Sequence, residues 1–187
     1  MTLTKETLQQ EFESHAHANT MDMISATSKL EIESQDVRMT KPNWKSYLQG
    51  EMIPQEDFNF ITAYENTKGE ERKALLEKSK QQCARTFLNL MTNVATVQSV
   101  KYILTLIDDM LQEDRSRVDI FNSYARKQKQ SVWAAFLAML SRQDGFIINK
   151  ASSIIAKLAC WSPELIDGTD LTFYFTFLKE QLRLPVI

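Results

Sequence analysis

Residues 83–114 read CARTFLNLMTNVATVQSVKYILTLIDDMLQED and carry two apolar stripes at helical spacing. The first stripe recurs at i, i+4, i+7, i+8 and i+11, and its members are Cys83, Phe87, Leu90, Met91 and Val94. The second stripe has the same period, with Val100, Ile103, Leu104, Ile107, Met110 and Leu111. The pattern returns at Ile147, Ala151, Ile154, Ile155 and Leu158. The sequence therefore predicts a succession of amphipathic helices.

None of these helices is stable alone. Burying five apolar side chains stabilises a helix by on the order of 10 kcal/mol, at roughly 1.5 to 3 kcal/mol each. Ordering about fourteen backbone residues costs roughly 1 to 2 kcal/mol apiece. Each helix must therefore pack against neighbours on more than one side. With only 4 Gly and 4 Pro to form turns, an all-α fold is favoured over a sheet-rich one.

Helix boundaries follow from proline, glycine and capping residues. Ser116 followed by Asp119 resembles a capping box, and Ser162 before Pro163 is typical of a helix start. Asp167 and Gly168 predict a turn. We expect helices over Ile24–Val37, over Trp44–Leu48, from Pro54 through Tyr64, from Glu70, from Ser116 through Tyr124, over Trp133–Leu140, from Pro163 and over Leu171–Leu182.

The helix over Leu171–Leu182 is apolar on nearly all sides and needs cover from a following element. The sequence ends five residues after Leu182. We therefore expect this carboxy-terminal helix to expose apolar surface and to self-associate.

Charge and cysteine content narrow the classes of protein. The net charge is −2, and residues 1–40 carry three Lys/Arg against seven Asp/Glu, so no basic field favours nucleic acid as a partner. No apolar run reaches the roughly 20 residues that cross a bilayer, so direct membrane insertion is not expected.

Cys83 and Cys160 both fall in apolar helical patterns, which predicts buried free thiols in a reducing compartment. A disulfide between them is the alternative.

Residue types suited to catalysis do not converge. His15 and His17, with Glu13, lie in a polar tail, where solvated side chains are expected and no metal. Asp108 and Asp109 are adjacent, so they point about 100° apart on a helix, and we expect solvent-facing charges. No activated nucleophile and no glycine-rich phosphate loop is present, so we expect no cofactor and no enzyme.

A binding scaffold needs a contact surface. The charged ridge of Arg126, Lys127 and Lys129 is the first candidate, because solenoid faces usually present polar side chains to partners. A solvated turn is the simpler interpretation of the same residues. Trp44 and Tyr47 are weaker candidates, because aromatic side chains at helical spacing, like Trp133, more often belong to a core.

Five colinear blocks also resemble a known family. They are WKSYLQG at 44–50, CARTFLNLMTN at 83–93, YILTLIDDMLQED at 102–114, LSRQD at 140–144 and IIAKLACW at 154–161. Their order and spacing, from about Ile24 to Leu182, are similar to those of the H subunit of the vacuolar-type proton ATPase. The resemblance implies an α-solenoid of HEAT or armadillo type and a non-catalytic regulatory subunit of the cytosolic sector of the pump.

Family members run more than twice this length, so the resemblance implies a truncated chain that holds part of an amino-terminal solenoid domain. We expect a flexible acidic extension over 1–22, a partial helical-repeat domain over 23–182 and a short divergent tail over 183–187. An abrupt end of this kind is expected of a truncated product, an alternative transcript or a partial gene model.

The implied partners are the other subunits of the pump, especially the helices of its peripheral stalk. The implied role is to help couple ATP hydrolysis to proton transport. The chain would then be cytoplasmic and would lie, through the pump, on the cytosolic face of vacuolar, endosomal or lysosomal membranes. The alternative is a free helical-repeat adaptor in endocytic or membrane-traffic interactions.

Overall fold

The computed structural model describes residues 29–94, 96–162 and 167–183, and all regular structure in these ranges is helical. The chain divides into two compact units, Met1–Met39 and Thr40–Ile187. In the first unit, residues 29–39 are helical, and the Ser34 hydroxyl donates to the Leu30 carbonyl at 2.7 Å. The predicted helix over Ile24–Val37 is confirmed from residue 29 on. Residues 24–28 and the expected extension over 1–22 lie outside the described ranges.

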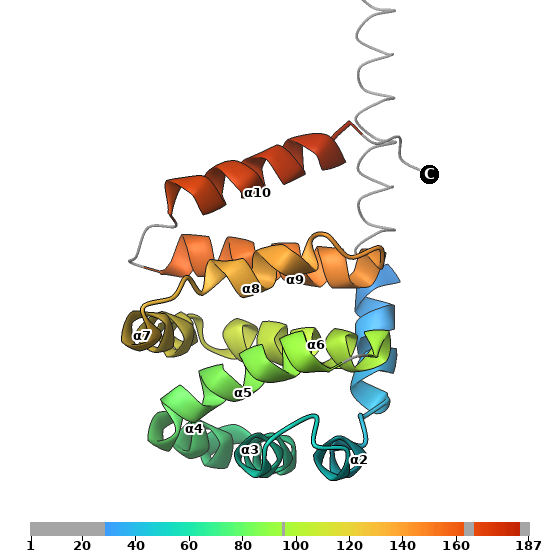
Figure 1. Cartoon of the computed structure of the whole chain (residues 1–187), viewed down its shortest axis with the longest axis vertical. Coiled ribbons are helices and arrows are strands. Elements are labelled where there is room, and N and C mark those ends of the chain that lie inside the picture. The colour runs from blue at the N-terminus through green and yellow to red at the C-terminus, as the bar shows by residue number, and fades with distance from the viewer. Residues whose placement is uncertain (1–28, 95, 163–166, 184–187) are drawn as a thin grey trace, which may run out of the picture. The chain divides into compact units, whose positions relative to one another are not determined.

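The second unit holds the remaining helices (Figure 1). In chain order they are α2 Trp44–Gln49, α3 Gln55–Asn66, α4 Gly69–Lys78, α5 Lys80–Asn93, α6 Val97–Glu113, the 3₁₀ turn η1 Arg115–Arg117, α7 Val118–Gln128, α8 Trp133–Met139, α9 Gly145–Trp161 and α10 Gly168–Gln181.

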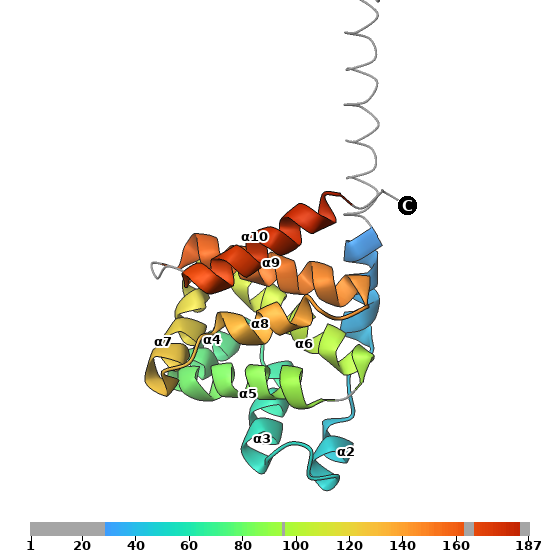
Figure 2. The ribbon, with the colours of Figure 1, turned by 45° about the horizontal axis from the view of Figure 1, so that its top comes forward.

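These helices pack in sequence order. α3 lies on α5, α5 lies on α6 and α7, α6 lies on α9, and α8 packs against both α9 and α10. In both ribbon views α5 and α6 separate α3 from α8 and α9 (Figures 1 and 2). Each helix thus contacts helices close to it in the chain, as in stacked helical repeats. The predicted α-solenoid is confirmed.

The three apolar stripes form the core of this unit. Every one of their members is buried, with exposures of 2% or less. Aromatic side chains join neighbouring helices. The rings of Phe87 in α5 and Tyr64 in α3 pack edge-on, with their centroids 5.2 Å apart. The ring centroids of Phe121 in α7 and Phe136 in α8 are 5.7 Å apart. Since each stripe contacts more than one helix, the packing supplies the cover that a single helix lacks.

Side-chain caps begin several helices. Asn43, Thr96, Asp144 and Asp167 each accept a backbone N–H of the first turn of α2, α6, α9 and α10. Such caps satisfy N–H groups that have no partner within the helix. Asp167 is therefore a helix start rather than the predicted turn, and α10 begins at Gly168, three residues before the expected Leu171.

The predicted cap at Ser116 is wrong. Ser116 does not open α7: its backbone N–H and hydroxyl both donate to Asp114, which caps η1, and α7 begins two residues later without a side-chain cap. Ser162 ends α9, and its N–H donates to the Leu158 carbonyl. The helix expected from Pro163, with Ser162 as its cap, lies outside the described residues and stays a prediction.

Helix α10 exposes apolar side chains, as its composition predicts. Phe173 is 49% exposed and Phe175 is 60% exposed, and Leu182, just beyond the helix, is 88% exposed. Tyr174 faces inward, and its hydroxyl donates to the Ser152 carbonyl of α9 at 3.1 Å. Among the helices of the described ranges, none combines the length and apolarity needed to cross a bilayer.

Candidate protein-binding surface

The predicted ridge of Arg126, Lys127 and Lys129 is exposed at the end of α7. Lys129 takes a left-handed conformation with φ of +54° and closes the helix, its N–H donating to the Ala125 and Arg126 carbonyls. The Arg126 guanidinium pairs with Asp119 at 3.3 Å. The side chains of Lys127 and Lys129 form no hydrogen bond or ion pair with any described residue. Their charges are therefore available to a partner.

The aromatic candidates lie on a different helix. Trp44 of α2 is 5% exposed, and its indole N–H donates to Glu65 Oε1 at 2.8 Å. The Tyr47 hydroxyl shares hydrogen bonds with Thr96 Oγ1 at 3.1 Å and Ser99 Oγ at 2.9 Å. Both side chains therefore join α2 to neighbouring helices. In both ribbon views α2 and α7 lie apart, so the structure does not bring the two sets of candidates together (Figures 1 and 2). Trp133 is also buried, at 6% exposure.

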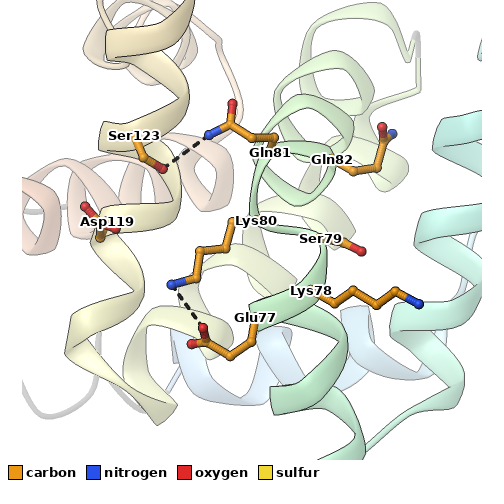
Figure 3. Close-up of a pocket in the computed structure, with 8 residues that line it drawn as sticks. All are labelled: Glu77, Lys78, Ser79, Lys80, Gln81, Gln82, Asp119 and Ser123. Carbon is orange, nitrogen blue, oxygen red and sulfur yellow. Dashed lines mark hydrogen bonds and ion pairs between the residues drawn. The ribbon is translucent and has the colours of Figure 1, made fainter.

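An open polar groove separates the α4–α5 junction from α7. Two adjoining hollows of about 620 and 200 Å³ share Glu77, Lys80 and Asp119. Figure 3 shows Glu77 and Lys80 reaching toward α7, with Asp119 and Ser123 opposite them. The remaining lining residues, which together with these four define the groove, are Lys73, Leu76, Lys78, Ser79, Gln81, Gln82, Asp114, Ser116, Arg117 and Ile120.

The expectation that Asp108 is a solvent-facing charge is wrong. It does not face solvent: it is 9% exposed and lies between α6 and α9. The Lys150 ammonium donates to Oδ2 at 3.0 Å, Lys157 pairs with Oδ1, and the Ser153 hydroxyl donates to Oδ1 at 3.3 Å. Burial alone would raise the pKa of the Asp108 carboxyl, but the two lysines outweigh it and hold that pKa below its usual range. Asp109 is half-buried.

Sequence reasoning missed a second buried carboxyl, Asp57 in the first turn of α3. It is fully buried and accepts hydrogen bonds from Gln82 at 2.9 Å and Thr86 at 2.8 Å on Oδ1, and from Asn89 at 3.1 Å on Oδ2. These three donors follow each other at i, i+4 and i+7 on α5, a polar stripe beside the apolar one. That spacing was the signal that a polar partner would face α5.

The two cysteines differ in environment. Cys83 is fully buried and free, and burial raises the pKa of its thiol. Cys160 is also free but is exposed, so the prediction of a second buried thiol is wrong. Residue 160 lies on the outer face of α9, away from the stripe through Ile154 and Leu158. The alternative of a disulfide does not hold.

The buried polar groups of the second unit serve packing. Asp57 joins α3 to α5, and Asp108 joins α6 to α9, each with its oxygens occupied by side chains of the neighbouring helix. No group of three potential metal ligands occurs within the described ranges, while His15 and His17 lie outside them. The arrangement is that of an all-helical repeat protein with an interior that joins its helices and a polar outer groove.

Comparison with known proteins assigns the family. A family model described as the V-ATPase H subunit matches residues 28–185. The chain is 52% identical over 172 residues to a probable V-type proton ATPase H subunit, the second of its kind in Caenorhabditis elegans, covering 90% of this chain and 37% of that protein. It is 46% identical over 162 residues to the V-type proton ATPase H subunit of Drosophila melanogaster, covering 87% and 34%. The chain belongs to the family of V-ATPase H subunits.

The resemblance carried by the five sequence blocks is therefore confirmed. Those blocks correspond to α2, most of α5, most of α6, the turn before α9 and the second half of α9. The chain spans about a third of the length of the curated relatives it matches.

Proposed function

We propose that this chain is a non-catalytic, regulatory subunit of the cytosolic sector of the vacuolar-type proton ATPase. It binds the helices of the peripheral stalk and helps to couple ATP hydrolysis to proton transport. The observation that carries this proposal is the family match across residues 28–185, which includes all of the described solenoid.

The physical character of the solenoid supports a binding role. Its two buried carboxyls are engaged by neighbouring helices, so neither is presented to a substrate. Its outer surface offers a polar groove beside a basic ridge, and stacked repeats commonly bind other polypeptides on such extended surfaces. In this role the chain is held on the cytosolic face of vacuolar, endosomal or lysosomal membranes by the pump itself.

Affinity capture tests the proposal. A tagged chain is expressed in cells of the organism that encodes it and is captured under native conditions. The proteins that co-purify with it are identified by mass spectrometry. We expect catalytic and peripheral-stalk subunits of the pump among them, in larger amounts than with the tag alone. Recovery of endocytic adaptors without pump subunits would support the adaptor alternative and contradict the proposal.

A further inference from the structure

The groove and the ridge belong to one surface. Asp119, Ser123, Arg126 and Lys127 stand at i, i+4, i+7 and i+8 of α7, so they share one face of the helix. The first two line the groove, and the ion pair between Arg126 and Asp119 links them to the ridge. A partner seated along this face of α7 would therefore contact both.

We propose that this surface, the groove together with the ridge, binds an acidic segment of a partner polypeptide. The inference rests on the proposed function for the identity of that partner, which is then a stretch of the peripheral stalk. The chemistry of recognition comes from the charges of the surface itself.

Positive charge on this surface exceeds what its own acids neutralise. Lys80 pairs with Glu77 at 3.1 Å, while Lys73 and Arg117 pair with acids just outside the groove, Glu70 at 3.9 Å and Glu113 at 2.6 Å. Two exposed lysines of the ridge, Lys127 and Lys129, remain without a side-chain partner among the described residues. In a chain whose net charge is −2, this local excess favours an acidic partner.

The acids of the groove favour a polypeptide over a phosphate polymer or a lipid surface. Glu77, Asp114 and Asp119 lie among the cations and would repel a uniform row of phosphates. A polypeptide can place carboxylates beside the lysines and neutral or basic side chains beside these three acids. The surface is also hollowed, which suits a protruding segment better than a flat bilayer.

Charge reversal at the ridge tests the inference. The variant K127E/K129E is compared with K45E/K179E, which makes the same charge change at two exposed lysines of α2 and α10. Each chain, with matching circular dichroism, is titrated against peripheral-stalk protein purified from the pump and against a Glu-Ala-rich helical peptide. We expect K127E/K129E to bind both probes about tenfold more weakly than wild type, with a smaller dependence on salt, and K45E/K179E to bind like wild type.

The outcomes separate the two proposals. Wild-type binding to the stalk protein that K127E/K129E retains in full would overturn the surface assignment and leave the proposed function intact. If wild type does not bind the stalk protein, the proposed function fails. In that case the titration with the Glu-Ala-rich peptide still tests the surface assignment. If the peptide shows no saturable binding to wild type, the assignment of this surface to an acidic segment is overturned. Equal, ridge-dependent binding of an RNA oligonucleotide or of phosphatidylserine vesicles would overturn the assignment to a polypeptide.

Discussion

At the scale of single residues, Asp108 shows how a buried charge holds two helices together. Replacing it by Asn leaves the Lys150 and Lys157 ammonium groups beside each other without a carboxylate. We expect Asp108→Asn to lower the free energy of unfolding by about 3 kcal/mol, measured by urea denaturation. The exposed ion pair of Asp119 is the matched control, and Asp119→Asn should cost less than about 1 kcal/mol. Equal losses in the two variants would show that burial of Asp108 has no special role.

The same carboxyl makes stability depend on acidity. Its pKa in the folded chain is below the usual value of about 3.9, so its contribution is complete above about pH 4 and is lost as the pH falls further. Asp144, beside Lys101, and Asp114, hydrogen-bonded to Ser116, also have lowered pKa values and act in the same direction. The stability of wild type should therefore fall below about pH 4, and that of Asp108→Asn should fall less steeply. Parallel acid profiles would contradict this.

The two thiols should differ in reactivity. Cys160 is exposed, whereas Cys83 is fully buried with a raised pKa, so little thiolate forms there. We expect one N-ethylmaleimide adduct on the native chain and two in denaturant, counted by intact mass. The variant Cys160→Ser should give no adduct until it is unfolded. Rapid addition of two adducts to the native chain would show that the α5 stripe opens readily.

At the scale of elements, the start of α9 depends on Asp144. This residue accepts the Ile147 N–H at 3.1 Å and pairs with Lys101 of α6 at 2.9 Å. We expect Asp144→Ala to lower the unfolding free energy by about 1 to 2 kcal/mol through loss of the cap. Its exposed neighbour provides the control, and Gln143→Ala should change stability by less than about 0.5 kcal/mol. A loss below that of the control would mean that α9 does not need the cap.

The sequence predicts elements better than contacts between them. The apolar stripes of α5, α6 and α9 are visible because helical spacing alone decides which side chains share a face. Which of Asp108 and Asp109 turns inward depends on α9, far along the chain. A signal existed there, since Lys150, Ser153 and Lys157 repeat at i, i+3 and i+7, but only the fold shows what they face.

Of the candidate surface, the ridge could be predicted from the sequence and the groove could not. The ridge could be proposed from a local run of cations, and its role in binding stays a prediction. The groove could not be proposed, because its walls come from α4, α5, η1 and α7 and form only when these elements pack. The false cap at Ser116 has a related cause: Asp114 competes for the same serine and opens η1 instead.

At the scale of the whole molecule, the exposed phenyl rings of α10 should drive association. Phe173 and Phe175 present apolar surface that is costly in water. We expect the purified chain to self-associate at high concentration and to bind a hydrophobic dye. The double variant F173Q/F175Q should do both less, with little change in thermal stability because neither ring is buried. If wild type is monomeric in equilibrium ultracentrifugation and does not raise the fluorescence of the dye, this surface is covered.

We propose that the outer surface of the solenoid holds the chain to a much larger assembly, the proton pump. Sedimentation of a native extract through a glycerol gradient tests this most directly, with the chain and the pump subunits followed by immunoblotting in each fraction. We predict that the chain sediments with the subunits of the proton ATPase, in fractions far heavier than its own 21.6 kDa. A chain that stays in the light fractions while the pump subunits sediment together would contradict its assignment to the pump.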